Sequence, residues 1–147
     1  MAVSARNFFT AEEQEEIRQA IEKAELDTSG EIRVHVENKC KGEVLDRAAY
    51  LFKKLGMHNT HHRNGVLIYL ALQNRKFAII GDTGIHKNVP ENFWEDIKQT
   101  MSGYFLRKEF CDGLCYAVTA TGEQLKKHFP FQVGDGNELP DDISFGK

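Results

Sequence analysis

The sequence lacks a long apolar run. No window approaches the roughly 20 apolar residues that a helix needs to cross a bilayer. Residues 1–6 also lack the apolar segment of a secretory signal. We therefore expect no membrane span and a cytoplasmic protein. Hydrophobic residues make up 41% of the 147 residues and charged residues 28%, a composition typical of a soluble globular protein with one core.

An excess of charge of one sign is also missing. The formal net charge is −3, and no long basic face stands out against the acidic residues. The basic stretch Lys126-Lys127-His128 is too short to change this interpretation. A nucleic-acid partner is therefore not expected, and we expect a monomer.

Cysteine is scarce and odd in number. The three cysteines are Cys40, Cys111 and Cys115, which argues against a disulfide framework in a chain without an export signal. Cys111 and Cys115 are four residues apart and would share one face of a helix. We interpret them as two small buried side chains. The alternative is a redox or zinc-binding pair, which the C-x3-C spacing supports poorly.

Two common catalytic sequence patterns are absent. The chain contains neither a Gly-x-Ser-x-Gly nucleophile elbow nor a Gly-x4-Gly-Lys-Ser/Thr phosphate loop. None of the cysteines sits on a turn that would require a nucleophile there. The sequence thus names no catalytic residue with certainty.

Hydrophobic periodicity predicts alternating helices and strands. Helices are expected over about 10–25, capped by Thr10, over about 43–55, ended by Gly56, from Pro90 to about 106, and over about 111–127. Strands are expected over 31–37 as a half-buried strand, over 66–72 as a strand buried on both faces, and over 77–80. The tail over 131–147, rich in glycine, proline and acidic residues, is expected to be irregular.

This order of elements predicts the fold class. The first strand, the helix and the second strand form a βαβ unit with parallel strands, and a hairpin adds an antiparallel third strand. Helices must cover both faces of so apolar a sheet. The expected fold is a three-layer α/β/α sandwich with a central mixed sheet of three to four strands, forming a single domain over 1–130.

The hairpin predicts which residues meet at one end of this sheet. If Gln73-Asn74 forms a two-residue loop, Gly65 lies opposite Asp82; if the loop is one residue later, Gly65 lies opposite Gly84. In both cases the start of the second strand lies beside the bend in "IIGDTGIH". Glu31 begins a parallel strand and should lie at the same end.

Four oxygen-bearing side chains are thereby expected at one rim of the sheet: Glu31, Asn64, Asp82 and Glu91. Carboxylate, amide and backbone oxygens are the ligands of hard cations, so the rim is a candidate Ca²⁺ or Mg²⁺ site. The alternative is an ordinary turn, since acids, asparagine and glycine are also common turn residues. The histidines expected nearby, His58, His61, His62 and His86, could bind Zn²⁺ or Cu²⁺, but no recurrent zinc spacing supports this, and the role of the loop histidines stays open.

The order of four segments resembles a known family. The segments "GEIRVHV", "RNGVLIYLA", "FAIIGDTGI" and "FLRKEFCDGL" are similar, over roughly residues 10–130, to the TPM domain family. That family includes thylakoid-lumen proteins linked to photosystem II repair and many bacterial proteins, and this chain resembles a bacterial member. The order and spacing of the segments carry the resemblance, because no single motif is decisive.

The resemblance implies a sandwich fold, divalent-metal binding and, for plant members, an acid phosphatase activity. The chain departs from the family pattern at three positions: Arg63 replaces an aspartate, Asp82 a glycine and His86 a glutamate. The segment that contains Glu109 and Asp112 also belongs to the resemblance. If the preceding helix runs straight across the sheet, these two acids lie at the far rim, and a helix cap is favoured over metal ligation.

Three hypotheses follow. The first is a cation-binding TPM-like domain with a regulatory or scaffolding role and no catalysis. The second is a metal-assisted acid phosphatase, in which Asp82 holds the metal, Glu91 or His86 transfers a proton and Arg63 binds phosphate. The third is a ligand-free module that binds another protein through its acidic tail.

Overall fold

The computed structural model describes residues 5–26, 28–90, 92–131 and 143–146. The described helices are α1 (Ala5–Phe8), α2 (Ala11–Ala24), α3 (Val44–Lys54), α4 (Thr83–Asn88), α5 (Glu95–Leu106) and α6 (Phe110–His128). The described strands are β1 (Glu31–Glu37), β2 (Gly65–Ala71), β3 (Lys76–Gly81) and β4 (Ser144–Phe145). In this part of the chain no helix is long and apolar enough to cross a membrane.

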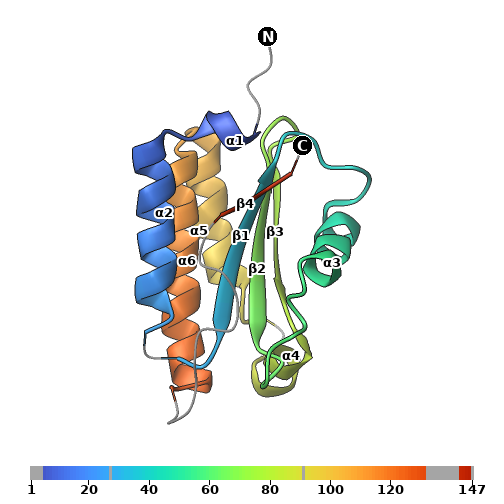
Figure 1. Ribbon diagram of the computed structural model, residues 1–147, viewed down its shortest axis with the longest axis vertical. Coiled ribbons are helices and arrows are strands. Elements are labelled where there is room, and N and C mark those ends of the chain that lie inside the picture. Colours follow the sequence, from blue (N-terminus) through green and yellow to red (C-terminus); the bar gives the residue numbers. More distant parts are fainter. Residues whose placement is uncertain (1–4, 27, 91, 132–142, 147) are drawn as a thin grey trace.

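The strands form one mixed sheet in the order β3-β2-β1-β4. β1 runs parallel to β2 and to β4, and β3 returns antiparallel to β2. Figure 1 shows α2, α5 and α6 on one side of the sheet and α3 on the other, with α4 at one end. The three-layer α/β/α sandwich expected from the sequence is confirmed.

The sheet separates two hydrophobic clusters. Alternate residues of β2 point to opposite faces, so Val66, Ile68 and Leu70 join the larger cluster with α2, α5 and α6. Leu67, Tyr69 and Ala71 join the smaller cluster with α3. All seven residues of β2 are buried, as its apolar sequence predicts for a strand covered on both faces.

The predicted helix boundaries hold where local capping is strong. The Thr10 hydroxyl accepts a hydrogen bond from the Glu13 amide and the Glu13 carboxylate accepts one from the Thr10 amide, both at 3.0 Å. This reciprocal capping box begins α2. Gly56 follows α3 with a φ of +72°, which is the backbone conformation that glycine adopts readily after a helix.

Three predictions about elements were wrong. The helix expected from Pro90 begins at Glu95, and a short helix, α4, precedes it. A proline disfavours helical geometry in the residue before it. Val89 is accordingly extended, with φ −129° and ψ 154°, and α4 ends there. The tail over 131–147 was expected to be irregular; its residues 132–142 and 147 lie outside the described residues, but Ser144–Phe145 form the short strand β4. β1 was expected to be half-buried, but only Arg33 of its seven residues is not buried, because β4 and charged partners cover its polar side chains.

Candidate functional site

Three strand ends meet at one end of the sheet. Glu31 pairs with Gly65 across the parallel strands, and Val66 pairs with Gly81 across the hairpin. The Asp82 amide then donates to the Gly65 carbonyl at 2.9 Å. This is the register predicted for a Gln73-Asn74 loop. We call the end of the sheet formed by residues 31, 64–65 and 81–84 the rim.

The backbone at the rim is packed so closely that one position requires glycine. The Gly84 amide donates to the Arg63 carbonyl at 2.8 Å. A Cβ atom at residue 84 would lie 2.4 Å from the His62 carbonyl oxygen and 2.6 Å from that of Arg63. The bend of "IIGDTGIH" is therefore pressed against the loop that leads into β2.

Asp82 caps α4 and forms an ion pair. Its Oδ1 atom accepts a hydrogen bond from the Thr83 amide at 2.7 Å, which satisfies one free amide at the start of the helix. The Arg63 guanidinium donates to both carboxylate oxygens at 2.8 and 2.9 Å. The Asp82 side chain is 4% exposed and that of Arg63 is 49% exposed, so the carboxylate is buried beneath a guanidinium that still faces solvent.

Asn64 is the most deeply buried polar residue of the rim, with no exposed surface. Its amide nitrogen Nδ2 donates to the Ser29 hydroxyl at 3.1 Å. Its backbone amide donates to the Thr60 hydroxyl at 3.3 Å. Among the described residues, the Oδ1 atom of Asn64 has no hydrogen-bond partner. Buried polar atoms are rarely left unpaired, so this oxygen is an unusual feature of the rim.

The chemistry of the rim suits a hard cation in part. Glu31 is 2% exposed and Asp82 5% exposed, so two carboxylates and one unpaired amide oxygen are buried where the three strand ends meet. These are the donors that Ca²⁺ and Mg²⁺ bind. Arg63 opposes such binding because it already neutralises Asp82. Glu91, expected here from the sequence, lies outside the described residues.

The sequence model of the TPM domain family matches residues 3–124, which is most of the chain. The chain belongs to the TPM domain family. The fold of this TPM domain is similar to that in the NMR structure of BA42 protein from the psychrophilic bacterium Bizionia argentinensis, with a TM-score of 0.89. The two sequences are 43% identical, and the match covers 95% of this chain and 96% of that one.

Two more distant structures share the fold alone. The N-terminal domain of a protein from P. gingivalis is 18% identical and matches 84% of this chain and 83% of its own with a TM-score of 0.67. The N-terminal domain of cg2496 protein from Corynebacterium glutamicum is 13% identical, and the match covers 80% of this chain and 74% of that one with a TM-score of 0.64. No curated protein matches the chain significantly.

The histidines of this TPM domain do not converge. The rings of His61 and His62 meet edge to face at 4.7 Å, while His86 is exposed on α4. His58 is half-buried, and its Nδ1 atom has no hydrogen-bond partner among the described residues. Within those same residues, no three histidine, cysteine or acidic ligand atoms of this loop gather closely enough to hold a metal.

Glu109 and Asp112 lie far from the rim. Phe105 packs on Phe77 at 5.2 Å between ring centroids, and Phe110 packs on Phe8 at 5.5 Å. These contacts place the start of α6 at the hairpin end of the sheet, opposite α4 (Figure 1). Glu109 precedes α6 and pairs with Arg107 at 3.2 Å. The expectation that these acids lie at the far rim therefore agrees with the structure.

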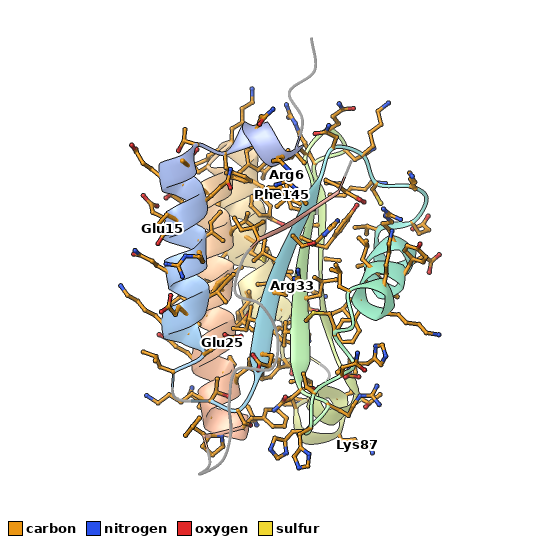
Figure 2. The ribbon with its side chains drawn as sticks, viewed as in Figure 1. Arg6, Glu15, Glu25, Arg33, Lys87 and Phe145 are labelled. Carbon is orange, nitrogen blue, oxygen red and sulfur yellow. The ribbon has the colours of Figure 1, made fainter. Side chains whose placement is uncertain are left out.

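A second polar cluster, which the sequence did not reveal, lies at the end of β1 near the hairpin. The Arg47 guanidinium donates to both oxygens of Glu37 at 2.9 Å, and the Tyr69 hydroxyl also donates to this carboxylate. The Nδ1 atom of His35 lies 2.9 Å from the Ser144 hydroxyl. The cluster borders a cavity of about 730 Å³. Figure 2 shows Phe145 of β4 beside Arg6 at this end, with Lys87 of α4 at the other.

The alternation of "EIRVHVE" was the available sign of this cluster. It marked Glu37 and His35 as polar residues on one face of β1, but not that Arg47 of α3 and Tyr69 of β2 would bury them. Likewise, the sequence predicted that Asp82 meets residues 64 and 65, but not that Arg63 would pair with it.

Proposed function

We propose that this TPM domain binds a divalent cation of the Ca²⁺ or Mg²⁺ type at the rim, in a regulatory or scaffolding role. The observation that carries the proposal is the buried Oδ1 atom of Asn64, which has no hydrogen-bond partner among the described residues. A cation there would remove the free-energy cost of an unpaired buried oxygen.

The carboxylates of Glu31 and Asp82 would supply the negative charge. Both belong to strand ends that pair directly with Gly65, the residue after Asn64. Ca²⁺ takes six to eight oxygen ligands at about 2.3–2.6 Å, so backbone carbonyls and water would complete the shell. Glu91, a candidate ligand from the sequence, lies outside the described residues and remains part of this proposal.

Arg63 would lower the affinity of the rim for a cation. Its guanidinium holds both oxygens of Asp82, so a cation can use this carboxylate only when Arg63 releases it. Arg63 also has a φ of +50°, a left-handed conformation that aspartate adopts more readily than arginine. The change Arg63→Asp should therefore remove the competing charge, add a ligand and ease the backbone together.

A metal titration followed by amide NMR shifts tests the proposal. We expect shifts at Glu31, Asn64 and Gly84 on adding Ca²⁺ to ~1 mM, the weak end of known calcium sites. Arg63→Asp should bind at least about tenfold more tightly, which is ~1.4 kcal/mol. Asp112→Asn, which removes an acid at the opposite end of the sheet, is the matched control. A rim that stays silent in both wild type and Arg63→Asp would end the proposal.

A metal-assisted phosphatase is the second candidate. The observation that favours it is the half-exposed Arg63, whose Nη1 atom takes no part in the two hydrogen bonds to Asp82 and could bind a phosphate oxygen. Turnover of p-nitrophenyl phosphate across acidic pH, in wild type and in Asp82→Ala, separates the two candidates. Equal activity in both proteins, or none in either, removes the phosphatase.

A further inference from the structure

A second set of metal-ligand atoms lies on the opposite side of this TPM domain from α3. Cys111 and Cys115 are one turn apart on α6, and Glu16 faces them from α2. The Sγ atoms and one carboxylate oxygen all lie within 4.8 Å of one another. The Cys111 Sγ atom is 3.7 Å from Glu16 Oε2.

These separations are close to those of a tetrahedral zinc site. With Zn–S bonds of about 2.3 Å and Zn–O bonds of about 2.0–2.2 Å, the edges of a tetrahedron measure about 3.5–3.8 Å. Two ligands at positions i and i+4 of one helix form a known chelating arrangement. Small side-chain movements, without a change in the backbone, would bring all three atoms to one ion.

We propose that Glu16, Cys111 and Cys115 form a binding site for Zn²⁺ that links α2 to α6. The donor set separates this site from the rim, because thiolates select soft and borderline cations whereas the rim offers only hard oxygen ligands. The two proposals therefore stand or fall independently.

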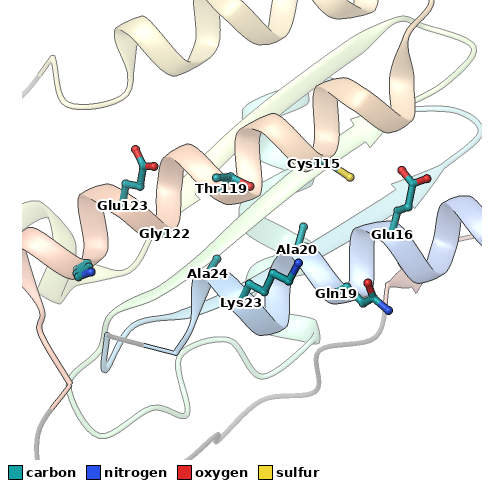
Figure 3. Close-up of a pocket in the computed structure, with 10 residues that line it drawn as sticks. Glu16, Gln19, Ala20, Lys23, Ala24, Cys115, Thr119, Gly122 and Glu123 are labelled. Carbon is teal, nitrogen blue, oxygen red and sulfur yellow. The ribbon is translucent and has the colours of Figure 1, made fainter.

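The surroundings leave room for a fourth ligand. A groove of about 460 Å³ runs between α2 and α6, and its lining includes Glu16, Cys115, Thr119 and Lys23. Figure 3 shows Glu16 and Cys115 facing each other across this groove. Cys111 is buried at 8% exposed, so the fourth position of the ion would open toward the groove and hold water. Three protein ligands with one open position is an established zinc geometry.

Metal binding at this site is linked to the protonation of the two thiols. Burial raises the pKa of both thiols, so the metal must displace two protons when it binds. Two thiolates and one carboxylate around Zn²⁺ leave a net charge of −1. Lys23 and Lys126 line the groove and would offset this charge, while Glu123, which also lines it, would act in the opposite direction.

The test is a Co²⁺ titration of the full, reduced chain in excess Ca²⁺, so that hard-oxygen sites do not contribute. We expect one Co²⁺ per chain with a thiolate-to-cobalt charge-transfer band and the intense visible bands of tetrahedral Co²⁺, all removed by stoichiometric Zn²⁺. Release of about two protons per ion should accompany binding. A wild-type protein without the charge-transfer band would overturn the proposal.

Variants assign the ligands. Cys115→Ser changes the less buried thiol, so it is the main variant and should lose most of the band while keeping its far-ultraviolet circular dichroism. Glu16→Gln should weaken binding at least about tenfold, since even outer-shell losses cost that much. Cys40→Ser is the matched control, because Cys40 packs with the α3 cluster on the other face of the sheet. An unchanged band in Cys115→Ser, or a lost band in Cys40→Ser, contradicts the assignment.

Discussion

Single side chains decide what the rim can bind. Asp82 is held by an amide of α4 and by Arg63, and it is nearly inaccessible to solvent. Removing the guanidinium of Arg63 would leave the buried carboxylate of Asp82 without its compensating charge, which destabilises the fold. Arg63→Asp is expected to be tolerable only because a cation can replace the guanidinium, so stability of this variant should depend on added metal.

The close packing of the rim requires a residue without a side chain at Gly84. We expect Gly84→Ala to destabilise the fold by about 1–3 kcal/mol, because its Cβ would meet two backbone carbonyls that cannot rotate away. The midpoint of urea unfolding measures this change. Weakened cation binding should accompany it, since the loop that contains Asn64 must move.

Gly103→Ala is the matched control for that change. Gly103 lies inside α5, and among the described residues a Cβ there would have only the flexible Arg107 side chain nearby, at 3.5 Å. Replacing glycine by alanine within a helix stabilises it by up to about 1 kcal/mol. Opposite signs for the two variants would support the close packing at residue 84, whereas a neutral Gly84→Ala would contradict it.

At the scale of elements, what could be predicted followed local rules. The capping box of Thr10, the periodicity of α2, α3 and α6, and the apolar run of β2 each carry their own evidence in a few neighbouring residues. The pairing of Gly65 with Asp82 followed from one turn and simple counting. The predicted part of the candidate site is this backbone arrangement.

Elements that depend on distant partners escaped prediction. α4 is only six residues long, too short for a periodic pattern, and its start depends on the Asp82 cap. β4 is two residues long and exists through pairing with β1. Counting along the hairpin placed Asp82 beside Gly65 but could not show that the Arg63 side chain pairs with it. The contact of Glu16 with Cys111 joins two helices far apart in the sequence, so no spacing rule could reveal it.

Across the whole molecule, the two polar clusters lie at opposite ends of a sheet whose strand β2 is buried along its whole length. The rim lies at the end near α4, and the cluster of Glu37, Arg47, Tyr69 and His35 lies toward the hairpin end, beside a cavity. The central residues of β2 fill both hydrophobic clusters.

The buried cluster at the hairpin end should make the stability of this TPM domain depend on pH. Burial lowers the pKa of His35, and the neighbouring Glu37 does not offset this effect. Burial alone would raise the pKa of Glu37, but hydrogen bonds from Arg47 and Tyr69 outweigh it and the pKa is lowered. In both cases the unfolded chain takes up the proton at a higher pH than the folded chain.

The free energy of unfolding should therefore be highest when the pH is above the ordinary pKa values of both groups. It should fall as the pH drops, first below about 6.5 because of His35 and then below about 4.5 because of Glu37. Each group can contribute at most ~1.4 kcal/mol per pH unit to this slope. Urea unfolding on either side of pH 6.5 measures it. His35→Gln should flatten the first part of the slope, and His86→Gln, which changes an exposed residue of α4, should leave it unchanged. Greater stability on acidification, or an unaltered slope in His35→Gln, would show that the cluster does not hold His35 in its neutral form.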